Sequence, residues 1–228
     1  MAGKVGGKIV TSGLVLALDA ANRNSYRGTG TSWNDLSGNN RNGTLTNGPS
    51  FVNSNGGYFS FDGVDDYLSS PSIDMNTGTG FTVCLLFRQI DPQVRSNWNY
   101  LYAQGNFEIG CYNASPIEKY FIFKDNGIPL DAYVTNVSDS WNYLAFGTNA
   151  TTRYPFVYCY NSSGFSSGTN STSFSSTTLN FTTFFYGSGP SGNLYYRANC
   201  AVIQAYNRTL TTTEVAQNYN ALKSRFGI

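Results

Sequence analysis

Apolar and aromatic residues recur along this chain in short runs, separated by stretches rich in Asn, Gly, Ser and Thr. Residues 81–87 are apolar on both faces, which is the pattern of a central strand covered on each side. Comparable runs occupy residues 14–18, 98–102, 107–112, 120–124, 141–146, 154–160, 181–186 and 198–206. Their close spacing, with turn signals between them, predicts an antiparallel sandwich and not alternating strands and helices.

One aromatic run is interrupted by a strong turn signal. Residues 58–61 carry three rings, Asp62-Gly63 follows, and an extended run resumes at Tyr67. Glycine adopts positive φ at little cost and aspartate bonds its own backbone, so this stretch predicts a β-hairpin. Its rings cannot be buried on one ribbon alone, so the hairpin must lie inside a larger stack of sheets.

A single helix is predicted, at the end of the chain over about residues 212–224. Thr211 can cap its first turn and Glu214, three residues later, can return the bond, which forms a capping box. Apolar residues from Val215 to Leu222 then follow at helical spacing. No other segment shows a convincing helical pattern, so the predicted class is all-β with one C-terminal helix.

Composition narrows the classes of function. Of 228 residues only 12% are charged and the net charge is +1, so no basic surface is expected to attract nucleic acid or an anionic membrane. The chain has no histidine, which removes the commonest general base and the usual zinc ligand. We find no signal peptide and no apolar run of membrane-spanning length, so synthesis in a cytoplasm is expected.

The four cysteines stand far apart, each in an apolar or aromatic run, and none forms a C-x-x-C pair. That distribution favours buried free thiols over disulfides and over a metal or redox site. The four are Cys84, Cys111, Cys159 and Cys200.

Four short segments carry a resemblance to a known family. Phe61-Asp62-Gly63-Val64-Asp65-Asp66-Tyr67, the segments 13–19 with 35–45, and the segment 206–215 resemble laminin-G-like, concanavalin A-like jelly-roll domains. The resemblance implies a two-sheet antiparallel jelly-roll sandwich with one terminal helix, filling residues 13–228 as one domain after an N-terminal arm at residues 1–12. Domains of this family occur in the virion proteins of tailed bacteriophages.

Catalysis is not expected, although the concanavalin A-like fold includes glucanases. Such enzymes need two carboxylates on one face of a strand, about 5 Å apart in a retaining mechanism. The glutamates here are Glu108, Glu118 and Glu214, and none has a second carboxylate two residues away. A Ser-His-Asp arrangement is impossible without histidine. The prediction is therefore a protein that is not an enzyme and has no catalytic residues.

Calcium is the one cofactor for which the sequence offers candidate ligands. The candidate ligands are loop oxygens: Asp19, Asp35, Asn39, Asp62 and Asp65. The alternative is that these residues bond backbone amides in turns, where Asp and Asn are common. No EF-hand-like spacing is present, and we favour the turn interpretation.

The aromatic content also suggests a surface on which sugars could stack, because exposed Tyr and Trp offer flat apolar faces with a polar edge. Most rings are needed for the core. Four tyrosines near predicted turns are the expected exposed ones: Tyr112, Tyr154, Tyr195 and Tyr196.

The N-terminal arm is basic and punctuated by glycines, and it is too poor in apolar side chains to pack into a core by itself. Ordering a residue costs about 1–2 kcal/mol, so the arm is expected to order only against a neighbouring protein. Lys4, Lys8, Ile9 and Val10 are the predicted docking residues.

Two hypotheses of function follow. The first is a virion structural protein of a tailed phage, a surface or capsid decoration component assembled in the host cytoplasm and attached through the arm to capsid or tail-associated proteins, with self-association as a further option. The second is a lectin-type module that binds a host glycan. Neither hypothesis includes a nucleic-acid or membrane partner.

Overall fold

The structure is a computed structural model. It describes the backbone of residues 7–54, 56–75, 79–90, 98–104, 107–115, 118–125, 128–134, 140–173, 180–184, 186–189 and 192–228. Side chains of residues 98–109, 111–131 and 180–194 lie outside the description. All statements below refer to the described residues.

The largest sheet has eight strands in the order β14-β13-β12-β7-β18-β5-β4, with β1 paired to β18. Its central strands are long and its edges short, and every pairing in it is antiparallel. The strands are β1 (Leu14–Asp19), β4 (Ser50–Val52), β5 (Tyr58–Phe61), β7 (Phe81–Gln89), β12 (Asn142–Thr148), β13 (Pro155–Asn161), β14 (Gly164–Thr169) and β18 (Ala198–Tyr206).

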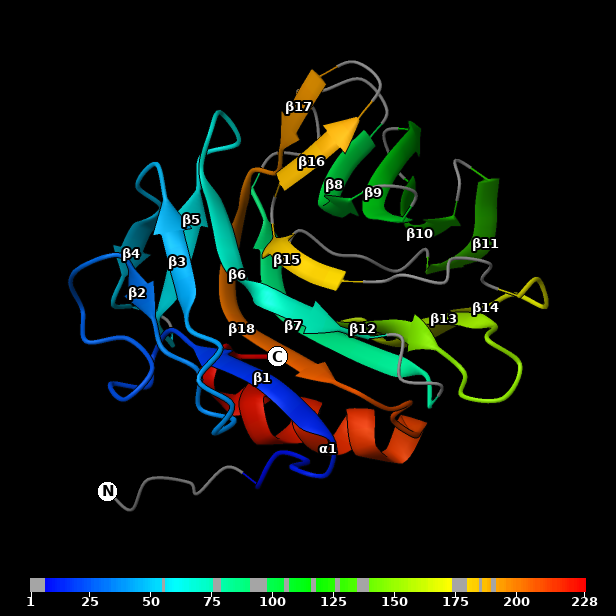
Figure 1. Cartoon of the computed structure of the whole chain (residues 1–228), viewed down its shortest axis with the longest axis horizontal. Helices are drawn as coiled ribbons and strands as arrows, with labels where there is room; N and C mark the ends of the chain where they lie inside the picture. Colours follow the sequence, from blue (N-terminus) through cyan, green and yellow to red (C-terminus); the bar gives the residue numbers. More distant parts are fainter. Residues whose placement is uncertain are drawn as a thin grey trace.

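Two further sheets make up the rest of the fold. A four-stranded sheet has the order β15-β6-β3-β2, with β2 (Ser32–Trp33), β3 (Gly43–Thr46), β6 (Tyr67–Asp74) and β15 (Asn180–Phe184). A six-stranded sheet has the order β11-β10-β9-β8-β16-β17, with β8 (Trp98–Gln104), β9 (Phe107–Ser115), β10 (Glu118–Asp125), β11 (Ile128–Val134), β16 (Tyr186–Gly189) and β17 (Gly192–Tyr195). In Figure 1, β6 and β15 run across β7 and β18.

The predicted fold class is confirmed: the chain is an all-β antiparallel sandwich with one C-terminal helix. The strands outside the eight-stranded sheet form two separate hydrogen-bonded sheets. One parallel contact also occurs, between Gly187 of β16 and Ala103 of β8.

Two apolar cores lie on the two faces of the eight-stranded sheet. Val83 and Leu85 of β7 point into the core between the layers, where Leu68 of β6 also lies. Cys84 and Leu86 point to the opposite face and pack in a second cluster with the C-terminal helix. Since eight of the nine residues of β7 are buried, the prediction of a central strand covered on both sides is confirmed.

The helix α1 (Thr212–Leu222) begins where the capping box predicts, and a 3₁₀ turn, η1 (Lys223–Arg225), continues it. Both bonds of the box form, since the Thr211 side chain accepts from the Glu214 N–H while the Glu214 carboxylate accepts from the Thr211 N–H at 2.9 Å. Arg208 donates to the same carboxylate at 2.6 Å. The helix therefore begins at a point anchored to the end of β18.

The hairpin predicted around Asp62 is wrong. β5 pairs with β18 and β4, whereas β6 pairs with β3 and β15, so the chain crosses here from one layer to the other. The crossing places Phe61 of β5 and Leu68 of β6 in the same buried core from opposite sides. Two strands with apolar faces bury more apolar side-chain surface when they face each other across a core than when they pair as neighbours in one sheet.

The turn in this crossing requires glycine. Gly63 has φ of +75°, and a Cβ added there would lie 2.8 Å from the Arg197 Cβ. The Asp62 carboxylate accepts the N–H groups of Val64 at 2.7 Å and Asp65 at 3.3 Å. Asp62-Gly63 thus forms a turn, as the sequence predicts, but this turn connects two sheets and does not close a hairpin.

Three of the four cysteines are free and buried, as predicted, and Cys111 lies outside the described side chains. Burial raises the pKa of Cys84 and of Cys159 to about 12 and raises that of Cys200 further. These thiols stay protonated near neutral pH, so they behave as small apolar groups of the core.

Candidate functional site

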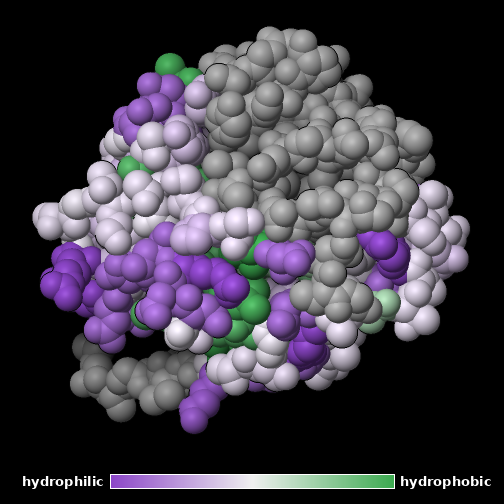
Figure 2. Space-filling view, in the orientation of Figure 1, coloured by the Kyte–Doolittle hydropathy of each residue, from purple (hydrophilic) through white to green (hydrophobic). Residues whose placement is uncertain are grey.

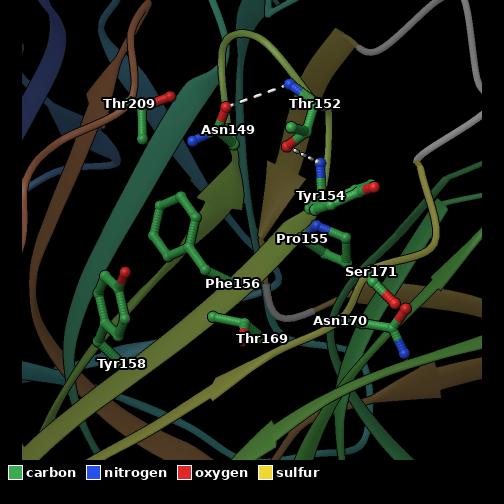
Figure 3. A pocket seen from close by; sticks show the side chains of 10 residues that line it. All are labelled: Asn149, Thr152, Tyr154, Pro155, Phe156, Tyr158, Thr169, Asn170, Ser171 and Thr209. Carbon is green, nitrogen blue, oxygen red and sulfur yellow. Dashed lines mark hydrogen bonds between the residues drawn. The ribbon is translucent and has the colours of Figure 1, made fainter.

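A pocket of about 520 Å³ opens at the end of the eight-stranded sheet where β13 begins. Three segments far apart in the sequence meet there: the turn from β12 to β13 with the first half of β13, the end of β14 with its following loop, and Thr209 before α1. Side chains that line it include Asn149, Thr152, Tyr154, Phe156, Tyr158 and Thr209 (Figure 3).

The rim is held by local hydrogen bonds. Asn149 Oδ1 accepts from the N–H groups of Thr151 at 2.8 Å and Thr152 at 3.2 Å, which closes the turn between β12 and β13. Thr209 donates its hydroxyl to the Thr148 carbonyl at 2.8 Å and fixes the loop before α1 against the same strand. The rim is therefore fixed at both sides, so little conformational entropy of the rim would be lost when a ligand binds.

Aromatic rings line the pocket from β13. Figure 3 shows Phe156 and Tyr158 projecting from the same side of that strand, as alternate strand residues must. Their rings stack, with centroids 4.8 Å apart and planes 27° apart. Burial raises the pKa of Tyr158, so its phenol stays protonated and can donate a hydrogen bond.

Phe156 and Tyr158 form the aromatic wall of the pocket, and Gly147 leaves room for it. Gly147 lies opposite Phe156 in the pairing of β12 with β13. A Cβ at this glycine would lie 1.9 Å from the Phe81 carbonyl oxygen and 2.9 Å from Phe156 Cζ. Any larger residue here would push the ring or the strand out of place.

The pocket carries no formal charge. Its ten lining residues are three aromatics, a proline, two asparagines, three threonines and a serine. This set can hydrogen-bond hydroxyl groups and pack against an apolar ring face. It supplies no carboxylate, imidazole, thiol or amine for acid–base or nucleophilic chemistry.

The predicted calcium ligands take structural roles at three of five positions. Asp19 forms a bidentate pair with Arg225, both contacts at 2.7 Å. Asp35 accepts four hydrogen bonds from Ala17, Ser37 and Arg41. The Asn39 amide donates to Ser37 Oγ at 2.9 Å and to the Leu14 carbonyl at 3.3 Å. Asp19 and Asp35 also accept backbone N–H groups, Asp19 from Ala21 at 3.0 Å and Asp35 from Ala17 at 2.9 Å, as the turn interpretation expects, and calcium binding at the three positions stays a prediction.

Asp62 and Asp65 come together with a third carboxylate of the same loop, that of Asp66. Their carboxylate oxygens lie within 4.8 Å of one another, and the structure does not bring Asp19 or Asp35 to them. Burial raises the pKa of Asp66, and the two neighbouring carboxylates add to that effect against a hydrogen bond from the Asp62 N–H. The calcium prediction stays a prediction for this turn.

Of the predicted docking residues, Val10 lies in the protein's own core, with 7% of its surface exposed. Its N–H donates to Asn218 Oδ1 at 2.7 Å, and its carbonyl accepts from the Tyr206 hydroxyl at 3.0 Å. The expectation that the arm orders only against a neighbouring protein is therefore wrong for Val10. The reason is that Asn218 of α1 and Tyr206 of β18 are buried polar residues, and the Val10 backbone satisfies one hydrogen bond of each.

The other docking residues lie closer to solvent. Lys8 is exposed and its carbonyl accepts from Gln217 at 2.8 Å, while Ile9 is half-buried. Lys4 lies outside the described residues. Docking through this arm stays a prediction.

The tyrosines expected to be exposed differ in their burial. Tyr154 is 36% exposed and lines the pocket, whereas Tyr196 is 1% exposed and belongs to the core. Tyr195 is half-buried, and the Tyr112 side chain lies outside the description. Phe156 and Tyr158 were not singled out, although the alternation of rings in residues 154–160 is the signal that finds them.

No helix among the described residues is long and apolar enough to span a membrane. Figure 2 shows mostly hydrophilic and intermediate residues over the described part of one face. Hydrophobic residues appear there only in small areas, so polar side chains solvate much of this surface.

Comparison with known sequences finds no matching family model and no matching curated protein. Solved structures do match. A Trypanosoma rangeli sialidase mutant with trans-sialidase activity is 14% identical, with a TM-score of 0.64 over 97% of this chain and 34% of that one. The same sialidase in complex with sialic acid is 13% identical, with a TM-score of 0.60 over 97% and 36%.

A third match is similar in extent to this chain. Domain 4 of AbnA, a GH43 extracellular arabinanase from Geobacillus stearothermophilus, in complex with arabinotriose, is 14% identical, with a TM-score of 0.61 over 91% of this chain and 98% of that domain. The chain spans about a third of the sialidase chains that it matches. At these identities the likeness establishes the fold: a β-sandwich shared with a domain of carbohydrate-processing enzymes.

Proposed function

We propose that this protein is a non-enzymatic, lectin-type β-sandwich domain that binds a neutral glycan. The observation that carries the proposal is the pocket at the start of β13, where stacked rings lie beside a rim of amide and hydroxyl groups without a charged side chain. Sugars present both an apolar ring face and many hydroxyl groups, and this lining complements both.

The structural comparisons support the carbohydrate class. The arabinanase domain, crystallised with arabinotriose, is matched over nearly its whole length. The sialidases are longer chains, of which this protein matches about a third, so their hydrolytic activity is not carried over. The lack of an acid or base in the pocket lining supports binding without hydrolysis.

A glycan array followed by calorimetry tests the proposal. The expected result is that the protein binds neutral glycans. Tyr158→Ala should lower the affinity about tenfold or more, because the variant removes a stacking surface. Tyr133→Ala is the matched control, since Tyr133 is an exposed tyrosine that does not line the pocket. An array without neutral-glycan binding, or an equal loss in both variants, would contradict the proposal.

A second candidate function is that of a virion structural protein of a tailed phage, as a surface or decoration component. The observation that favours it is the sequence resemblance at residues 61–67, together with an exposed Lys8 at the start of a segment held on α1. The two functions are compatible, because a particle can display a glycan-binding domain. Partners would be capsid or tail-associated proteins, or a second copy of this chain.

The composition of purified phage particles tests this second candidate. Quantitative mass spectrometry should find the chain at a fixed copy number per particle. Finding the protein only in the soluble fraction of the infected cell would reject the virion assignment while leaving the glycan proposal intact.

A further inference from the structure

The aromatic wall of the pocket continues along the outer face of the sheet. In the pairing of β13 with β14, Phe156 lies opposite Thr169, and Tyr160 opposite Phe165. Alternate strand residues share one face, so these positions and Tyr158 lie on the same side of the sheet. That side carries α1, because Tyr158 and Tyr160 pack in the apolar cluster under the helix.

The rings form a continuous row that ends at the helix. Phe165 lies 6.0 Å from Tyr158 and 4.6 Å from Tyr160, between ring centroids. Tyr160 in turn stacks on Tyr219 of α1 at 4.9 Å with planes 23° apart. Lys223 lies over the far ring, with its Nζ 5.3 Å from the Tyr219 centroid, and marks the end of the row.

Phe165 is the open member of this row. It is 47% exposed, although it packs against two neighbouring rings. A ring that is supported on one side and open on the other offers a fixed apolar surface, so a ligand can stack on it at little cost in side-chain entropy.

Uncharged hydroxyl groups connect Phe165 with the pocket. Ser167 is exposed and lies opposite Tyr158, and Thr169 already lines the pocket. No residue of β14 is charged. From Thr169 to Phe165 the strand covers about 13 Å, which exceeds the length of a single sugar ring.

We propose that the site is an extended one, in which a linear neutral oligosaccharide enters the pocket with one end and stacks a later sugar on Phe165. This inference rests on the glycan-binding function proposed above and adds its substrate class: a chain of several neutral sugars and not a single terminal sugar. The row of rings and the uncharged hydroxyl groups between them are what such a chain would contact.

Two series of probes test the extension: arabinose to linear arabinohexaose, and glucose to cellohexaose, each titrated by calorimetry. The wild-type protein should bind the longer members of one series more tightly. Phe165→Ala should lower the affinity for those longer members about tenfold and leave the shortest binding member unchanged. Phe165→Tyr should retain affinity, because it keeps the ring.

Tyr158→Ala distinguishes the two proposals, since it should weaken every member that binds. If short sugars bind and length adds nothing, or if Phe165→Ala is silent or acts equally on all lengths, the extended site is wrong and the pocket function stands. If no member of either series binds and the array is also negative, both are wrong. The melting temperature of each variant controls for folding, and Phe165 is exposed enough for truncation to be tolerated.

Discussion

Single aspartates in this protein hold loops through hydrogen bonds, and Asp35 is the fullest example. One carboxylate oxygen accepts from the N–H groups of Ala17 and Ser37, both at 2.9 Å. The other accepts from the Ser37 hydroxyl at 2.7 Å and the Arg41 N–H at 3.1 Å. Burial alone would raise the pKa of Asp35, but these hydrogen bonds outweigh it and the pKa lies below its usual value.

Asp35→Ala should therefore destabilise the protein by about 2–3 kcal/mol, because partly buried donors lose a charged acceptor. The free energy of urea unfolding, measured with and without added calcium, checks this. The loss should be the same in both conditions. A loss that appears only with calcium would assign Asp35 to a metal site instead.

The sign of the pH dependence follows from the lowered pKa. The unfolded carboxyl group takes up its proton at a higher pH than the folded one, so the contribution is present above its ordinary pKa and is lost as pH falls through the folded pKa. Asp35→Asn should flatten this part of the acid-unfolding curve. An unchanged acid limb would contradict the assignment.

At the scale of an element, α1 is specified by its own first turn. The capping box leaves the Glu214 carboxylate bound by both Thr211 and Arg208, and Arg208 chiefly lowers the pKa of that carboxyl to about 2. Below the cap, Val215 and Leu222 are buried against the outer face of the sheet. The helix is thus fixed by local bonds at its start and by packing along its length.

Thr211→Ala should lower the free energy of unfolding by about 1 kcal/mol through the lost cap. Thr213→Ala is the matched control, since Thr213 is an exposed helical residue with no capping role and alanine favours the helix. Denaturant unfolding of both variants provides the measurement. Equal effects of the two substitutions would show that the cap contributes nothing.

At the scale of the whole molecule, the two ends of the chain are joined. β1 pairs with β18, Arg225 beyond α1 holds Asp19 at the end of β1, and Val10 lies beside Asn218 in the second core. Figure 1 shows the blue N-terminal segment beside the red helix. Residues 8–12 are therefore held against the domain, and attachment through an N-terminal arm stays a prediction for the residues before them.

Two truncations test this division. Deleting residues 2–7 should leave the melting temperature nearly unchanged, whereas deleting residues 2–12 should cost about 3 kcal/mol, because it removes a buried valine and exposes Asn218 and Tyr206. Thermal and urea unfolding of the two proteins provide the measurement. If the longer deletion is as stable as the full chain, residues 8–12 do not contribute to the fold.

Local sequence patterns predict correctly the features that depend on near neighbours in the chain. Alternation and apolar runs gave the strands and the doubly buried β7, and the Thr211–Glu214 spacing gave the start of α1. Asp62-Gly63 gave a turn with positive φ at the right residue. These features follow from backbone geometry and hydrogen bonds over a few residues, so a short window contains all of their information.

Which strands pair and which side chains meet depends on the packing of the whole chain. Whether the turn at Asp62 joins two paired strands or crosses between layers depends on where distant strands such as β18 lie. The pocket needs Asn149, Thr169 and Thr209 from three separated segments, and Val10 needs a partner more than two hundred residues away. Such choices are set by burial summed over the whole core, and no local pattern carries that sum.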